Sequence, residues 1–78
     1  MKLPNKIISY KESIISKMPP ILNFLEKSDK SILDTYKQVK HLFNNVQDFI
    51  DTLDCLFALN KISITEKEEL HYVKRNTL

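Results

Sequence analysis

The 78-residue sequence contains no glycine. Glycine adopts the left-handed backbone conformation more readily than any other residue, so tight turns and helix ends must here be formed by other residues. The nucleotide-binding loops GxxxxGK(S/T) and GxGxxG and the nucleophile elbow GxSxG all require glycine. The sequence therefore excludes these kinds of site.

The length of the chain limits it to one compact core. Hydrophobic residues make up 42% of the sequence and charged residues 28%, a balance typical of globular proteins. We expect residues 1–78 to form a single domain, in which residues 1–10 are an N-terminal segment without a clear period. The last residues, 76–78, are expected to fray.

A first helix is predicted between Ser13 and Leu25, where apolar residues recur at helical spacing. Pro19 and Pro20 lie within this stretch. A proline lacks the N–H that would bond to the preceding turn, and it disfavours the helical conformation of the residue before it. We therefore expect a kink or a break near Met18.

Two further helices are predicted to begin at capping residues. Ser31 and Asp34 have the spacing of a capping box, and the periodic set that follows extends to Phe43. Asn45 and Asp48 repeat this spacing before the clearest helix of the chain. The apolar stripe predicted for this third helix comprises Val46, Phe49, Ile50, Leu53, Leu56 and Phe57.

The third helix should end near Asn60, because asparagine tolerates the left-handed conformation that closes many helices. The period then changes to alternation, with Ile62 and Ile64 in one short run and Leu70 and Tyr72 in another, which predicts a β-hairpin. Its connection contains neither glycine nor asparagine, so a loop longer than a two-residue turn is favoured.

Three helices followed by a hairpin is the element order of a winged helix-turn-helix, in which the hairpin forms a C-terminal wing. A strand of one or two residues near Ser31 would complete it. The fold class is thus predicted to be mainly α with a small β-hairpin. A plain three-helix bundle is the alternative.

No arrangement of residues for catalysis or metal binding is apparent. A structural zinc site needs four ligands, usually in closely spaced pairs, whereas Cys55, His41 and His71 each stand alone. Acidic neighbours oppose formation of a nucleophilic thiolate at Cys55. We therefore expect no enzymatic activity, no cofactor and no small-molecule substrate.

A single cysteine cannot form an internal disulfide, and the N-terminus lacks the apolar core and cleavage site of a signal peptide. No run of about 18 apolar residues occurs, so no membrane span is predicted. The expected compartment is the cytoplasm.

The third predicted helix and the hairpin loop are acidic. Between Asn45 and Asn60 the chain has no lysine or arginine. The acidic residues of the two elements are Asp48, Asp51, Asp54, Glu66, Glu68 and Glu69. In a winged helix these elements would contact DNA, but their charge repels phosphate. We hypothesise that they bind a basic protein surface instead.

Basic residues lie mainly on other elements. Lys30, Lys37, Lys40, Lys74 and Arg75 are candidates for a contact with nucleic acid that is not sequence-specific. Ordinary solubilising charges are the alternative interpretation. The net charge of +2 indicates no partner by itself, because the two signs are interspersed.

Several stretches resemble the small middle components of bacterial ABC three-component systems. They are Leu3 to Lys6, Phe49 to Leu53, Leu56 to Ile62, and Tyr72 with Val73. The resemblance spans nearly the whole chain. One departure is Asn60, where the family commonly has a glycine, and asparagine suits the same helix end.

The resemblance implies a non-enzymatic subunit that bridges an SMC-like ABC ATPase and an effector, such as a nuclease, in anti-phage or mobile-element defence. Lamassu-type systems are similar in organisation. Its partners would form a hetero-oligomer, which could bring the subunit to DNA. The alternative is a small winged-helix DNA-binding regulator, which would need a basic exposed third helix.

Overall fold

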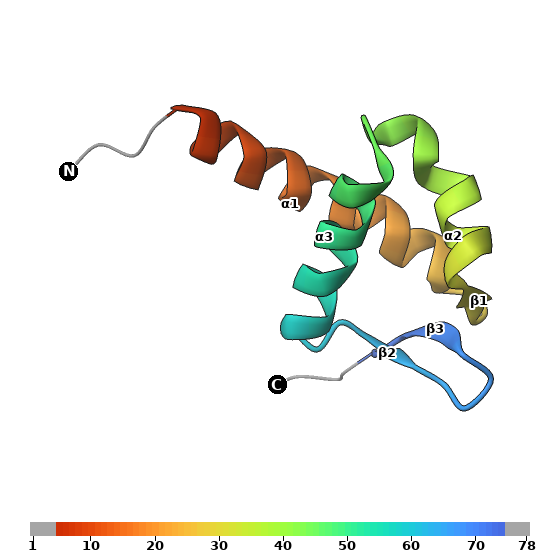
Figure 1. The fold of residues 1–78 in the computed structure, drawn as a ribbon. Coiled ribbons are helices and arrows are strands. Elements are labelled where there is room, and N and C mark those ends of the chain that lie inside the picture. Colours follow the sequence, from red (N-terminus) through yellow and green to blue (C-terminus); the bar gives the residue numbers. More distant parts are fainter. Residues whose placement is uncertain (1–4, 75–78) are drawn as a thin grey trace.

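The computed structural model describes the backbone of residues 5–74 and the side chains of residues 9–74. Over this range the chain forms three α-helices, one short 3-10 helix and three short strands (Figure 1). In chain order these are α1 (Asn5–Leu25), β1 (Lys30–Ser31), α2 (Ile32–Val39), η1 (Lys40–Leu42), α3 (Val46–Ala58), β2 (Ile62–Ile64) and β3 (Glu69–Tyr72). The predicted mainly helical class with a C-terminal hairpin is confirmed. The predicted fraying of residues 76–78 lies outside the described residues.

α1 is longer than its apolar pattern predicts. It begins at Asn5 rather than Ser13, so the second half of the segment expected to lack a clear period is helical. The pattern missed this part because the side chains described there, residues 9–12, are exposed and leave no apolar stripe facing a core.

α1 also continues through Pro19 and Pro20, so the predicted break near Met18 does not occur. Each proline leaves the carbonyl four residues earlier without an N–H partner. These carbonyls belong to Ile15 and Ser16, both of which are exposed, so water can replace the missing bonds. Pro19 itself is exposed and Pro20 is half-buried.

The capping residues of α2 and α3 are those predicted. Ser31 Oγ accepts a hydrogen bond from the N–H of Asp34 at 3.0 Å, and Asn45 Oδ1 accepts one from the N–H of Asp48 at 2.9 Å. α2 is shorter than predicted, because η1 follows it and Phe43 is already extended. Each cap satisfies a backbone donor that has no partner within its helix.

The end of α3 also agrees with the prediction. Asn60 adopts a left-handed conformation, with φ of 58°. Its N–H donates to the carbonyl of Phe57 at 3.0 Å, and the N–H of Lys61 donates to that of Leu56 at 2.9 Å. These two bonds form a Schellman motif, which turns the chain from α3 directly into β2.

The strands form an antiparallel sheet in the order β1-β3-β2. β2 and β3 are the predicted hairpin, in which Ile64 lies opposite Leu70. β1 is the predicted short strand, and its Ser31 lies opposite Glu69. Because Ser31 also caps α2, the sheet fixes the position at which α2 begins.

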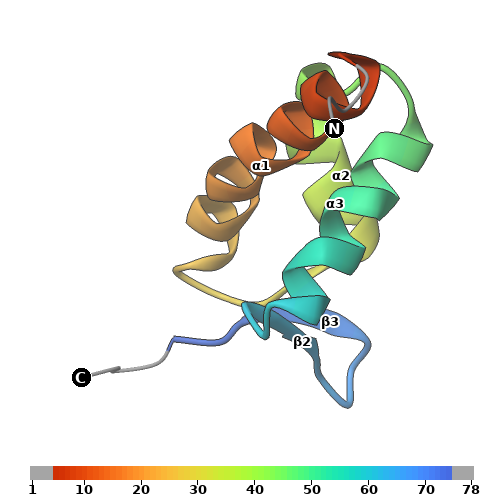
Figure 2. The same cartoon turned by 90° about the vertical axis from the view of Figure 1, so that its left-hand side faces the viewer.

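The core lies between the three helices and the sheet, and Figure 2 shows the hairpin beneath the lower ends of the helices. Its buried residues are Ile21, Leu25, Val39, Phe49, Leu53, Leu56, Ile62 and Leu70. The Phe49 ring is central, with its centroid 4.9 Å from that of Tyr36 and 5.6 Å from that of Phe43. These three rings join α2, α3 and the segment between them.

The predicted apolar stripe of α3 is partly wrong. Val46 and Ile50 are 53% and 37% exposed. Thr52 is buried instead, and its hydroxyl donates to the carbonyl of Asp48 at 2.8 Å. The hydroxyl is thereby satisfied, so the buried face of α3 can rotate toward Thr52 and turn Val46 and Ile50 outward.

The hairpin loop comprises residues 65–68 between β2 and β3 and is longer than a two-residue turn, as predicted. The carbonyl of Thr65 accepts a hydrogen bond from the N–H of Glu68 at 2.9 Å. The N–H of Thr65 donates to the carbonyl of Glu69 at 2.8 Å. Glu68 has a positive φ of 61°. This geometry is that of a turn closed by a left-handed residue, a position that glycine usually occupies.

Replacing Glu68 with glycine should therefore stabilise the protein. The left-handed conformation costs a non-glycine residue roughly 1–2 kcal/mol, and the extra freedom of glycine in the unfolded chain offsets part of the gain. We expect Glu68→Gly to raise the free energy of unfolding by about 0.5–1 kcal/mol in urea denaturation. Glu66→Gly, in the same loop at a position without positive φ, should not raise it. Equal effects of the two changes would contradict this explanation.

Candidate protein-binding surface

The three aspartates of α3 lie at different depths. Asp48, in the first turn, is half-buried, and its charge is favourable at the helix N-terminus. Asp51 is also half-buried, whereas Asp54 is exposed. Of the three, Asp54 is therefore the most accessible to another molecule.

The outer side of α3 forms one ridge of apolar and acidic residues. Val46, Ile50, Asp54 and Ala58 follow one another at four-residue spacing, which places them in a row along the helix. All four are exposed. We call this row the α3 ridge. Because α3 contains no lysine or arginine, the ridge suits a protein surface with an apolar patch and basic residues beside it.

Asp51 is held by two hydrogen bonds. The hydroxyl of Tyr10 on α1 donates to its Oδ2, and Gln47 Nε2 donates to its Oδ1 at 2.9 Å. Both bonds stabilise the carboxylate, the one from Tyr10 more than the one from Gln47. The pKa of Asp51 therefore lies below its usual value of 3.8. The same bond is the main cause that raises the pKa of Tyr10 from 10.0 to about 12. Asp51 therefore connects α3 to the first half of α1.

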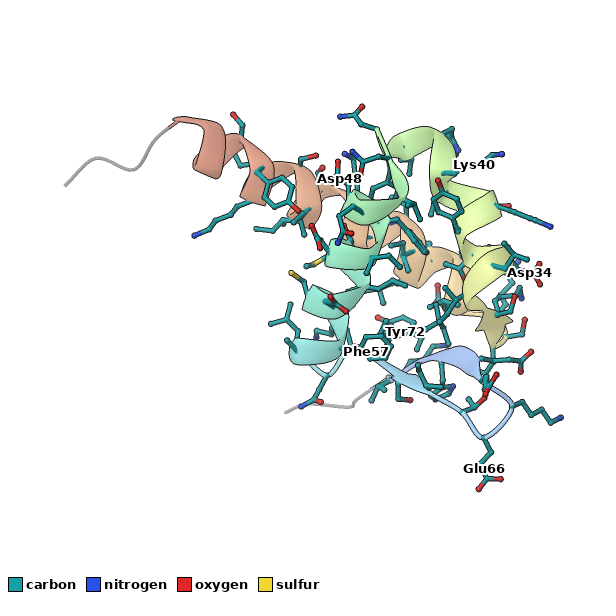
Figure 3. All side chains as sticks on the ribbon, viewed as in Figure 1. Asp34, Lys40, Asp48, Phe57, Glu66 and Tyr72 are labelled. Carbon is teal, nitrogen blue, oxygen red and sulfur yellow. The ribbon has the colours of Figure 1, made fainter. Side chains whose placement is uncertain are left out.

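The acidic residues of the hairpin loop form a separate group. Glu66 and Glu68 are exposed, and Glu69 is half-buried in β3. Figure 3 shows Glu66 at the tip of the hairpin and Asp48 at the opposite end of the molecule. The structure thus divides the six predicted acidic residues between α3 and the hairpin.

The candidate basic residues lie on different elements. Lys37 and Lys40 are exposed on α2 and η1. Lys30 Nζ donates to Ser28 Oγ and lies 5.2 Å from the centroid of Phe24.

Lys74, beyond β3, donates to the carbonyl of Glu26 at 3.1 Å and lies 5.9 Å from the Tyr72 centroid. These contacts hold Lys30 and Lys74 against the protein, so that Lys37 and Lys40 are the more accessible charges. Arg75 lies outside the described residues.

His71 has a partner that the sequence did not predict. It faces outward on β3, as the alternation predicts, and its Nδ1 lies 2.7 Å from Asp29 Oδ1. Both side chains are partly exposed, so this contact contributes little to stability. The contact links the loop between α1 and β1 to β3.

The structure adds no candidate for metal binding within residues 9–74, where no three His, Cys, Asp or Glu side chains gather at a common point. Cys55 is half-buried and lines a hollow with Ile14 and Met18 of α1.

No helix among the described residues combines the length and the hydropathy needed to span a bilayer.

The bond between Tyr10 and Asp51 should hold the first half of α1 in place. We expect amides of residues 5–16 to exchange with deuterium severalfold faster in Tyr10→Phe than in the wild type at pH 7. Tyr72→Phe, which removes a hydroxyl from β3, should leave this segment unchanged.

The difference should also depend on pH. Since the pKa of Asp51 is lowered by folding, the stabilisation is present at neutral pH and is lost as the pH falls through that lowered pKa. Since the pKa of Tyr10 is raised, the stabilisation is complete below pH 10.0 and is lost as the pH rises toward about 12. Equal exchange of Tyr10→Phe and wild type at pH 7 would contradict the role of the bond.

Comparison with known proteins gives one family. Residues 3–71 match the family described as ABC-three component (ABC-3C) system Middle Component 7. Searches of curated proteins and of solved structures gave no significant match. The matched residues include all of α1, α2, α3 and β2 and most of β3. The chain therefore belongs to the Middle Component 7 family of ABC-three component systems.

Proposed function

We propose that the chain is a non-enzymatic subunit that bridges an SMC-like ABC ATPase and an effector in a bacterial defence complex. Its membership of a middle-component family supports this role, because a component of a multi-component ABC system must bind other components. The defence would act against phages or mobile elements, with an organisation like that of Lamassu systems. ATP hydrolysis would be supplied by the ATPase subunit, and the complex would act in the cytoplasm.

The exposed side chains of the α3 ridge are the main structural support for this proposal. Exposed Val46 and Ile50 offer apolar area, and Asp54 beside them offers a charge. Apolar side chains surrounded by charges that select the partner are typical of protein interfaces. We infer that a basic surface of the ATPase binds here, and that the acidic hairpin tip makes a second contact.

We further propose that the fold is a winged helix, with α2 and α3 as the helix-turn-helix and β2 and β3 as the wing. The element order and the pairing of β1 with β3 support this assignment. In such a fold α3 would be the helix that reads DNA. The ridge offers no cation to phosphate, which is why we favour a protein partner over a DNA-binding regulator. Exposed Lys37 and Lys40 are the candidate contacts with DNA in an assembled complex.

Reversal of the charge on the α3 ridge should weaken ATPase binding. We expect Asp54→Lys to lower the affinity for the ATPase subunit by about tenfold or more, since it places like charges against each other in the interface. The measurement is isothermal titration of the ATPase subunit encoded in the same system. Far-UV circular dichroism of the variant checks that it is folded.

Glu26→Lys is the matched control, because it makes the same reversal of charge at an exposed position in the loop after α1. It should bind like the wild type. Wild-type affinity of Asp54→Lys would rule out the ridge as the ATPase site. Absence of binding by the wild type itself would contradict the proposed function as a whole.

A further inference from the structure

β2 forms one edge of the sheet. The strand order is β1-β3-β2, so β2 is paired on one side only. At the two ends of this pairing, the N–H of Val73 donates to the carbonyl of Lys61, and the N–H of Thr65 donates to that of Glu69. Hydrogen-bonded and non-hydrogen-bonded residues alternate along an antiparallel pair. Between the two ends, Ser63 therefore directs its N–H and carbonyl toward β3.

Ile62 and Ile64 direct their backbone groups the other way, away from β3. Within the described part of the chain, these N–H and carbonyl groups have no hydrogen-bond partner. The side chain of Ile64 is also 52% exposed. Unpaired backbone groups on an edge strand are a template for pairing with another strand. The outer edge of β2 is therefore suited to bind one more strand.

The residues that flank β2 carry opposite charges. Lys61, immediately before the strand, is exposed, whereas Glu66, Glu68 and Glu69 follow the strand. Within one chain these charges are separated by the length of β2. An antiparallel second copy of the same strand would bring the basic end of each β2 to the acidic end of the other. A second copy thus complements this edge both in hydrogen bonding and in charge.

We propose that two copies of the chain join through the outer edges of their β2 strands, antiparallel about a two-fold axis at Ser63. Ile62 of each copy then lies opposite Ile64 of the other, and their outward N–H and carbonyl groups bond to each other. The two-fold axis repeats every contact, so both edges are covered at once. This pairing goes beyond the proposed function and does not depend on it.

Charge favours this register over a shifted one. Lys61 lies opposite Thr65 of the other copy, and the neighbour of that Thr65 on β3 is Glu69, on the same face of the sheet. The long side chain of Lys61 can extend over Thr65 toward this carboxylate. A register that paired Ile64 with Ile64 would instead place Lys61 opposite Lys67, and like charges opposite each other are destabilising.

Disulfide crosslinking of the full chain tests the pairing. Two Ser63 residues at the axis form a non-hydrogen-bonded pair, with Cα atoms about 4.5 Å apart, which suits a disulfide. We expect Ser63→Cys, with Cys55→Ser to remove the natural thiol, to form a covalent dimer under mild oxidation. His71→Cys in the same background is the matched control. His71 lies beside Ser63 on β3, and its two copies would be roughly 14 Å apart, too far to bridge.

Sedimentation velocity over a range of concentrations gives a second test. The wild type should reach the mass of two chains, and Ile64→Lys should raise the Kd of the dimer by about tenfold or more, because a lysine on an edge strand opposes pairing. Leu33→Lys is the matched control, since Leu33 on α2 is 60% exposed and receives the same charge. It should dimerise like the wild type.

A wild type that stays monomeric at every soluble concentration would overturn the proposal. So would crosslinking of His71→Cys as fast as that of Ser63→Cys, or a dimer that Leu33→Lys weakens as much as Ile64→Lys does. If the wild type is monomeric and Ile64→Lys loses binding to the ATPase subunit, the edge of β2 binds that partner and the two-fold pairing is wrong. A dimer that behaves as expected but does not bind the ATPase would support the pairing while contradicting the proposed function.

Discussion

The inner face of α3 holds the helices and the hairpin together. Phe49, Leu53 and Leu56 on this face belong to one core with residues of α1, α2 and the hairpin. The Phe49 ring packs against the rings of Tyr36 and Phe43, so a single side chain joins α2 to the segment that leads into α3. Loss of a buried aromatic ring of this kind typically costs about 3–5 kcal/mol, a large part of the stability of so small a domain.

The same packing determines which residues are available for binding. Because α3 is held by its Phe49 face, the α3 ridge must point outward, and the ridge carries apolar and acidic side chains without a cation. The Schellman motif at Asn60 then directs the chain into β2, which places the acidic hairpin tip beyond the end of α3. The two acidic groups are thus positioned by core packing and by one left-handed residue.

Features set by neighbouring residues were predictable from the sequence. The caps at Ser31 and Asn45, the helix end at Asn60 and the hairpin all arise within a few residues, so spacing was enough to find them. The contacts of Tyr10 with Asp51 and of His71 with Asp29 span 41 and 42 residues, and no local pattern indicates them.

The exposure of Val46 and Ile50 was missed for a related reason. It depends on burial of Thr52, whose hydroxyl is satisfied by its own helix, and hydropathy assigns threonine to the surface. The candidate acidic residues were therefore identifiable from charge alone, whereas the apolar half of the α3 ridge became visible only in the fold.

We propose that the outer side of α3 binds the ABC ATPase, and the small size of the chain allows a direct test by NMR. The ¹⁵N-labelled protein would be titrated with the unlabelled ATPase subunit, and the shifted or broadened amide signals assigned to residues. We expect the changes to concentrate between Val46 and Ala58 and at the hairpin tip, from Glu66 to Glu69. Changes confined to α2 around Lys37 and Lys40, with α3 unaffected, would contradict binding of the ATPase by α3.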